Sequence, residues 1–219
     1  MIDWSLLWTG TLETLLMTLF ASGFSYLIGL PLGVLLVITR KGGIKTMPMF
    51  NAVLGAIINF MRSIPFILLI AMLIPVTRAV MGTAIGTAAS VFPLVVSAAP
   101  YVARMVEQSL LEVDSGVVEA SQSMGSTTLQ IIFKVLLPEA LPSLINGAAV
   151  SITTILAYTA MVSAVGGGGI GAYAITKGYQ RGKKFYSFMY AASAILVLLV
   201  QIITITGTRL SRRLDHRIR

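Results

Sequence analysis

The stretch LLMTLFASGFSYLIGLPLGVLLVI, residues 15–38, contains no charged side chain. A helix needs about 20 mostly apolar residues to cross the hydrocarbon core of a bilayer, so this run is long enough to span a membrane. Arg40 and Lys41 follow it directly, and Gly42 and Gly43 come next. The apolar residues are continuous rather than alternating, which argues against a strand of an outer-membrane barrel. We therefore expect a transmembrane helix here.

Four further apolar runs follow, and we place spans at residues 64–76, 84–102, 144–165 and 186–207. Arg62 interrupts the second run, and burying an arginine at mid-bilayer costs at least about 2.5 kcal/mol. We therefore place Arg62 at the cytoplasmic end of that span. The composition agrees with five spans, because only 11% of the 219 residues are charged, against about 25% in soluble domains. The predicted fold is an all-α, polytopic membrane protein with one transmembrane domain over residues 1–219.

The distribution of basic residues predicts the orientation. With the N-terminus outside, eleven Lys and Arg residues fall on the inner side and five on the outer side, as the positive-inside rule requires. The C-terminus is then cytoplasmic, and Trp4 and Trp8 lie at the outer interface. The net charge of +8 is thereby explained by topology, so the predicted partner is the lipid bilayer and not nucleic acid.

A polar insert over residues 104–141 separates the third and fourth spans and holds five of the eight acidic residues. It is too short to be an enzyme domain, and its pattern predicts two short helices. Asp114 or Ser115 can cap the first helix, and Gly125 breaks it. Thr127 and Gln130 form the pattern of a capping box for the second helix, which we expect Pro138 to end. Such a helix, corner and helix suits insertion into the groove of a partner protein.

Catalytic and metal-binding patterns are absent from the sequence. The glycine run 166–169 lacks the lysine of a phosphate-binding loop, and we interpret it as a flexible external turn. The chain has no cysteine, and its one histidine, His216, lies in a basic tail. We find no ionisable residue inside the predicted spans, which argues against a proton-coupled carrier. The energy for transport must come from elsewhere, or the protein is passive.

The fourth span carries small and polar residues along one helical face. This face can line a pathway for a neutral or zwitterionic solute, with Met161 as its gate, or it can serve helix packing; both readings stay open. The residues are Gly147, Ser151, Thr154, Tyr158 and Met161. Two glycine pairs, Gly29 with Gly33 and Gly82 with Gly86, predict close helix packing.

The insert contains a longer motif that resembles the motif of a known protein family. Glu119, Ala120 and Ser121 are followed after three residues by Gly125, and Val135-Leu-Leu-Pro138 begins nine residues later. This resembles the EAA loop of ABC-importer permeases, E-A-A-x3-G-x9-I-x-L-P, with Ser121 and Val135 as conservative departures. The stretches at 62–66, 93–100, 103–107 and 134–142 are similar to the methionine-importer branch of that family, and the resemblance covers about residues 10–207.

The resemblance implies a type I permease of the bacterial cytoplasmic (inner) membrane that transports methionine, with both the L and D forms as candidates. It implies a homodimer, two cytoplasmic ABC ATPase subunits and an external solute-binding protein. ATP and Mg²⁺ would bind the ATPase, so this chain would need no cofactor or metal and would not be an enzyme. The residues expected to couple ATP hydrolysis to transport are Glu119, Ala120, Ser121, Gly125, Leu137 and Pro138. A permease for another small amino acid or organic ion, and a stand-alone passive channel, are the alternatives.

Overall fold

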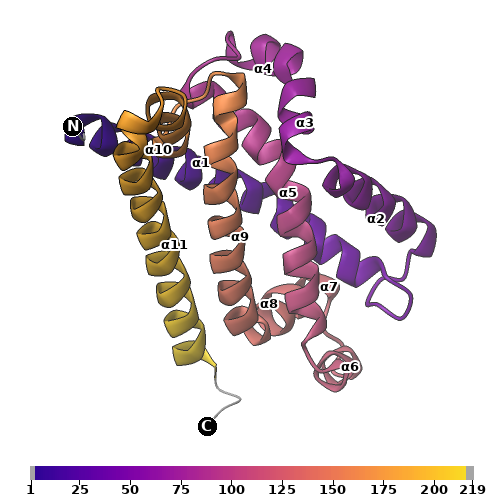
Figure 1. Ribbon diagram of the computed structural model, residues 1–219. Coiled ribbons are helices and arrows are strands. Elements are labelled where there is room, and N and C mark those ends of the chain that lie inside the picture. The colour runs from indigo at the N-terminus through magenta and orange to yellow at the C-terminus, as the bar shows by residue number, and fades with distance from the viewer. Residues whose placement is uncertain (1–2, 216–219) are drawn as a thin grey trace. The chain divides into compact units, whose positions relative to one another are not determined.

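The computed structural model describes residues 3–215, and His216 lies outside them. Within that range the chain is helical and contains no strand, which confirms the predicted fold class (Figure 1). The helices are α1 (Trp4–Thr39), α2 (Pro48–Ser63), α3 (Phe66–Met72), α4 (Ile74–Met81), α5 (Thr87–Leu111), α6 (Ser115–Ser123), α7 (Thr128–Ile131), α8 (Leu137–Glu139), α9 (Leu141–Met161), α10 (Ile170–Tyr173) and α11 (Tyr186–Leu214).

Four helical segments are long and apolar enough to cross a membrane, and the pair α2 and α3 makes a fifth if it is one broken span. The four are Trp4–Thr39, Thr87–Leu111, Leu141–Val165 and Lys183–Leu214. Each contains most of a predicted span, and α1 and α5 are considerably longer than expected. The helix α1 continues through Pro31, and α5 runs nine residues beyond the predicted end at residue 102. The first part of the insert is therefore an extension of the third span.

The second span differs most from the prediction. Residues 64–76 do not form one helix, because Pro65 lacks a backbone N–H and disfavours helical backbone at the residue before it. The chain therefore leaves the helix at Ile64 and Pro65, between α2 and α3. Arg62 does not mark the start of the span, since α2 begins at Pro48 and Arg62 lies in its last turn.

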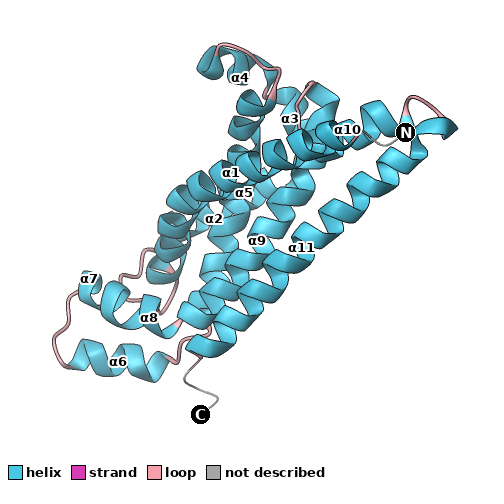
Figure 2. Ribbon diagram, turned by 90° about the vertical axis from the view of Figure 1, so that its left-hand side faces the viewer, coloured by secondary structure: helices cyan, strands magenta, loops and turns pink. Residues whose placement is uncertain are grey.

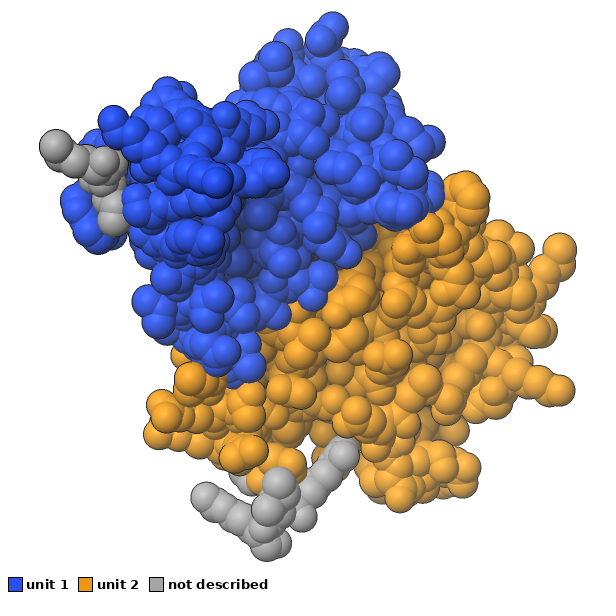
Figure 3. Space-filling model, viewed as in Figure 1, with its two compact units in different colours: residues 1–25, 64–98, 152–204 blue, residues 26–63, 99–151, 205–219 orange. Residues whose placement is uncertain are grey.

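The chain divides into two compact units, coloured separately in Figure 3, and each has its own apolar core. In unit 1 (residues 1–25, 64–98 and 152–204), Met17, Ile70, Leu94 and Ile155 are fully or almost fully buried together. In unit 2 (residues 26–63, 99–151 and 205–219), the core joins α1, α5 and the polar insert through Val34, Val102, Val106, Ile131 and Leu136.

Only one of the two glycine pairs serves helix packing. At Gly33 an added Cβ would lie 2.6 Å from the Ala103 carbonyl oxygen, and at Gly29 it would lie 2.8 Å from the Ala99 carbonyl oxygen. These glycines therefore let α1 approach α5 closely, as predicted. Gly82 and Gly86 instead have φ values of +77° and +101° with open space around them, so they are turn residues and the packing prediction is wrong there.

Candidate functional site

After the end of α5, the polar insert continues with a capped helix, as the sequence predicts. The Asp114 carboxylate accepts a hydrogen bond from the Gly116 N–H at 2.6 Å, which satisfies one of the free donors at the start of α6. Glu119 and Ala120 are exposed, whereas Ser121 is 5% exposed. The first three motif residues thus divide into two that face outward and one that is packed inside.

Gly125 turns the chain between α6 and α7. Its φ is +80°, a conformation that costs a residue with a Cβ roughly 1–2 kcal/mol. The Gly125 N–H donates to the Gln122 carbonyl at 2.9 Å, and the Ser126 N–H donates to the Ser121 carbonyl at 3.2 Å. An added Cβ would meet no atom within 4 Å. Glycine is therefore required here by the backbone conformation and not by crowding.

The second helix starts with the predicted capping box. The Thr127 N–H donates to Gln130 Oε1 at 2.8 Å, and the Gln130 N–H donates to Thr127 Oγ1 at 3.4 Å. The prediction that Pro138 ends this helix is wrong. A π-helical turn over Ile132–Leu136 widens the helix, with the Leu137 N–H bonded to the Ile132 carbonyl. The chain stays helical through Pro138 to Glu139, because the wide turn accommodates a ring that would clash in a regular α-helix.

The segment α6–α8 (residues 115–139), which lies within the predicted insert 104–141 and which we call the coupling loop after the role that its motif predicts, has a buried and an exposed apolar face. Ile131, Ile132 and Leu136 belong to the core of unit 2. On the other face Met124 is 79% exposed, Leu129 67% and Phe133 66%. Figure 2 shows α6 running alongside α7 and α8 with the corner at one end. The loop is therefore anchored in the same core as α5 and α1, and it presents an apolar surface outward.

The remaining predicted motif residues lie at the far end of the loop. Leu137 is half-buried and packs against the unit 2 core, whereas Pro138 is exposed. Ser121 and Gly125 line a shallow pocket of about 430 Å³ at the corner. Glu119 lines a separate cavity of about 80 Å³ together with Arg40. The structure thus brings Ser121 and Gly125 together and places Glu119 on a different side of α6.

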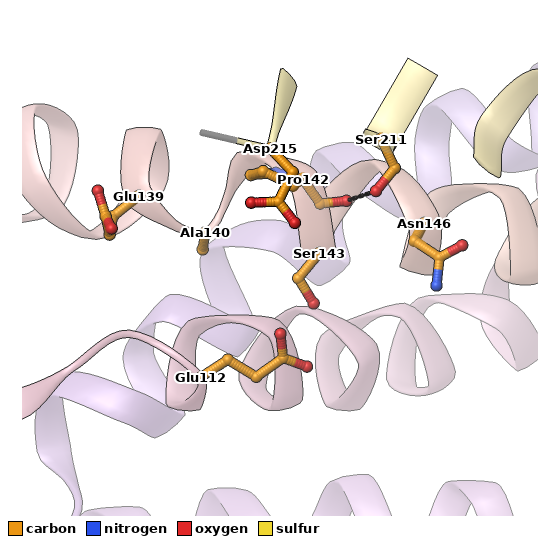
Figure 4. Close-up of a pocket in the computed structure, with 8 residues that line it drawn as sticks. All are labelled: Glu112, Glu139, Ala140, Pro142, Ser143, Asn146, Ser211 and Asp215. Carbon is orange, nitrogen blue, oxygen red and sulfur yellow. Dashed lines mark hydrogen bonds between the residues drawn. The ribbon is translucent and has the colours of Figure 1, made fainter. Parts of the chain in front are cut away.

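A polar pocket of about 240 Å³ lies beside the end of the coupling loop. Figure 4 shows Glu112, Ser143 and Asp215 gathered around it, with Glu139 at its edge. The Ser211 hydroxyl donates to the Pro142 carbonyl at 2.7 Å, which fastens the end of α11 to the start of α9. Among residues 3–215 no group of three or more His, Asp or Glu side chains is arranged to hold a metal ion.

The proposed pathway residues on α9 differ in their surroundings. An added Cβ at Gly147 would lie 3.5 Å from the Met105 and Ser109 side chains, and Ser151 is fully buried with its hydroxyl donating to the Gly147 carbonyl. This end of the face serves helix packing. Toward the other end, the Tyr158 ring stacks on Phe66 at 4.6 Å, Thr154 is half-buried, and Met161 is 45% exposed.

Sequence reasoning missed one polar constellation, which joins α1 to the glycine run. Glu13 Oε2 accepts a hydrogen bond from the Gly169 N–H at 2.7 Å, and Glu13 Oε1 accepts one from the Tyr173 hydroxyl at 3.2 Å. The Thr14 hydroxyl accepts one from the Ile170 N–H at 2.9 Å. Partial burial raises the pKa of Tyr173, and the hydrogen bond to Glu13 adds to this effect. The glycine run is thus a fixed loop, and the expectation of a flexible turn is wrong.

The position of Glu13 also corrects the account of charge in the spans. It lies within α1, two residues before the predicted start of the first span, so the apolar run alone did not include it. The sequence signal for this contact is an acidic residue just before an apolar run, together with a glycine-rich loop whose backbone N–H groups need acceptors. Its hydrogen bonds to Gly169 and Tyr173 hold the Glu13 carboxylate against the protein itself.

Comparison with known proteins places the chain in a family. The probable D-methionine transport system permease protein MetI of Vibrio cholerae is 47% identical over 97% of this chain and 93% of its own length. MetI of Escherichia coli K12 is 51% identical over 71% of this chain and 72% of its own length. A solved structure described as inward-facing conformations of the MetNI methionine ABC transporter contains a chain 45% identical to this one, with a TM-score of 0.93 over 96% of this chain and 97% of that one.

A family profile for the binding-protein-dependent transport system inner membrane component matches residues 29–219. The match includes the coupling loop, the core of unit 2 and the unit 1 core residues Ile70, Leu94 and Ile155. It agrees with the family predicted from the motif at 119–138. The chain belongs to this family of inner-membrane permeases.

Proposed function

We propose that the chain is the permease subunit of an ATP-driven methionine importer, with L-methionine and D-methionine as candidate substrates. The observation that carries this function is the likeness to the MetNI methionine transporter over 96% of the chain, with a TM-score of 0.93. The names of the similar curated proteins support methionine over another small amino acid or organic ion. We also propose that residues 1–219 form one transmembrane permease domain, with the region typical of the family at about 10–207.

In this proposal two copies of the chain form the pathway, and two ATPase subunits bind their coupling loops. The exposed side chains of Met124, Leu129 and Phe133 would contact a groove on the ATPase, and Glu119 would pair with a basic group there. Movement of the loop would reach the spans because Ile131 and Leu136 share a core with α1 and α5. Gly125 and the capping box keep the two short helices at a fixed angle. ATP and Mg²⁺ would bind the ATPase, so the chain itself would need no cofactor and would not be an enzyme.

We further propose that the N-terminus is outside and the C-terminus cytoplasmic, so that an external solute-binding protein meets the side that carries the glycine run. The proposed pathway follows the α9 face from Thr154 and Tyr158 to Met161, beyond the packed end at Gly147 and Ser151. Met161 is the proposed gate because it is the most exposed residue of the predicted face. Met161→Ala should then raise basal ATP hydrolysis.

Reconstitution tests the proposal. The chain is purified with its ATPase, placed in liposomes with the solute-binding protein, and assayed for ATP-dependent uptake of labelled methionine. Uptake that requires all three components supports the importer, whereas equal uptake by the chain alone identifies a passive channel. ATP-dependent uptake of another amino acid in place of methionine would retain the importer and change its substrate.

Variants of the coupling loop test the roles of its residues. Glu119→Lys should lower methionine uptake for each ATP hydrolysed while leaving the permease in the membrane. Asp3→Lys makes the same charge change at an exposed acid of unit 1 and serves as the control. Gly125→Ala strains the corner and should reduce uptake in the same way. Wild-type uptake in both Glu119→Lys and Gly125→Ala would refute the coupling role.

A further inference from the structure

The break between α2 and α3 leaves an arginine inside a candidate membrane span. The two helices together have the length and hydropathy of one broken span or of a re-entrant loop, and they are bent by 98° at the break. Arg62 lies in the last turn of α2, just before the break, and is therefore inside that membrane segment with its side chain exposed. Ionisable side chains at such positions are costly, face a water-filled or protein-lined space, and mark functional sites by default.

A second arginine in the same unit shows how the fold neutralises a guanidinium when the role is structural. Arg104 Nη1 donates to Glu107 Oε2 at 2.6 Å, and Arg104 Nη2 donates to Asn59 Oδ1 at 2.9 Å and to the Gly55 carbonyl at 3.0 Å. This network ties α5 to α2. The Arg104 side chain is 19% exposed, and its charge is balanced within the chain.

Arg62 has no such balance. Across the described range, 3–215, no carboxylate lies within the 4.0 Å ion-pair distance of its guanidinium. Its neighbour is the Tyr101 ring, whose centroid lies 5.9 Å from Cζ. A cation–π contact of this kind holds the guanidinium but leaves its charge and its N–H donors unpaired. Asn59 and Ser63 are exposed beside it on α2, so this stretch of the span is polar.

We propose that Arg62 binds the carboxylate of the transported amino acid during its passage through the membrane. The inference rests on the importer function proposed above and adds a substrate contact to it. A guanidinium offers a planar pair of N–H donors that matches both oxygens of a carboxylate. A free amino acid carries that carboxylate into the span, where Arg62 otherwise has no anion.

The test uses the permease and ATPase complex with three variants. Arg62→Met removes the charge, Arg62→Lys keeps the charge without the planar fork, and Arg78→Met is the same substitution at an exposed arginine of α4. With the loaded solute-binding protein, Arg62→Met should lower methionine uptake per ATP by about tenfold or more, because the substitution removes one charged contact to the substrate. Its stimulated ATP hydrolysis should stay near the wild-type rate. Arg62→Lys should be intermediate, and Arg78→Met should match wild type.

Direct binding identifies the recognised group. Without the binding protein, the wild-type complex should prefer L-methionine to L-methioninamide, which lacks the carboxylate, and Arg62→Met should lose that preference. The inference would be overturned by unchanged uptake in Arg62→Met, or if the wild-type complex showed no preference for the carboxylate. It would also be overturned if the substitution changed only the amount of co-purified anionic lipid or only the dimerisation of the permease. If the wild-type complex takes up no methionine at all, the proposed function fails instead, which separates the two conclusions.

Discussion

Glu13 holds the glycine loop against α1, and its removal should open that loop locally. In Glu13→Ala, the Gly169 N–H loses an acceptor 2.7 Å away and the Tyr173 hydroxyl loses one 3.2 Å away. The Thr14 contact to the Ile170 N–H remains, so the loop should stay attached at one point. The expected result is local opening at Gly169 rather than unfolding of the protein.

The size of the effect follows from the type of hydrogen bond. A hydrogen bond to a charged group contributes roughly 1.5–3 kcal/mol. Since about 1.4 kcal/mol corresponds to tenfold in an equilibrium constant, the opening equilibrium of the Gly169 amide should rise by about 10- to 100-fold. In Glu13→Gln an acceptor remains but its charge is lost, so the increase should fall between wild type and Glu13→Ala.

Hydrogen exchange measured by mass spectrometry on the purified protein reads this equilibrium directly. The informative peptide covers residues 166–173, and a peptide from α5 reports on global unfolding. Glu112→Ala, which removes an exposed acid elsewhere, is the matched control and should leave both peptides unchanged. Wild-type exchange at 166–173 in Glu13→Ala would refute the reasoning. Equal acceleration in the α5 peptide would show that Glu13 supports the whole fold instead of this loop.

Three further predictions concern pH, helix packing and the partly buried ion pair of Arg104 and Glu107. Because the pKa of Tyr173 is raised in the folded protein, its stabilisation should be complete below about pH 10, its ordinary value. That contribution should be lost as pH rises through the higher folded-state value, and Tyr173→Phe should abolish the dependence in unfolding curves. Gly33→Ala should cost about 1–3 kcal/mol of stability through overpacking, whereas Gly23→Ala, with no atom within 4 Å of an added Cβ, should be neutral or stabilising in thermal unfolding. Glu107→Leu should destabilise the protein by leaving the charge of Arg104 uncompensated, and the double variant with Arg104→Met should recover much of that loss.

Features carried by neighbouring residues could be predicted from the sequence. The Asp114 cap, the Gly125 corner and the Thr127–Gln130 capping box each depend on contacts within three residues along the chain, and the structure contains all three. Pro138 was misjudged for a related reason. The rule that proline ends a helix assumes a regular α-helix. The π-helical turn that precedes Pro138 could not be predicted from the sequence.

Features that depend on distant residues could not be predicted in the same way. Glu13 and Gly169 are 156 positions apart, and no local pattern connects an acid at the start of one helix to a free N–H in a later loop. The glycine pairs show the same limit. Gly29 and Gly33 share a spacing with Gly82 and Gly86, yet only the first pair faces another helix closely. Spacing alone therefore cannot distinguish a packing glycine from a turn glycine.

Arg62 and Arg104 lie close to apolar segments, and the sequence alone does not show which groups surround each charge. Both interrupt apolar sequence, and an insertion scale assigns both the same penalty. The structure separates them, because Arg104 lies beside Glu107, Asn59 and the Gly55 carbonyl, whereas Arg62 contacts an aromatic ring and no anion among residues 3–215. A fold that neutralises one guanidinium with three acceptors and leaves its neighbour without any reserves the second for an anion from outside the chain. For this reason the charge balance around each residue, rather than its position in the hydropathy profile, points to Arg62 as the substrate contact.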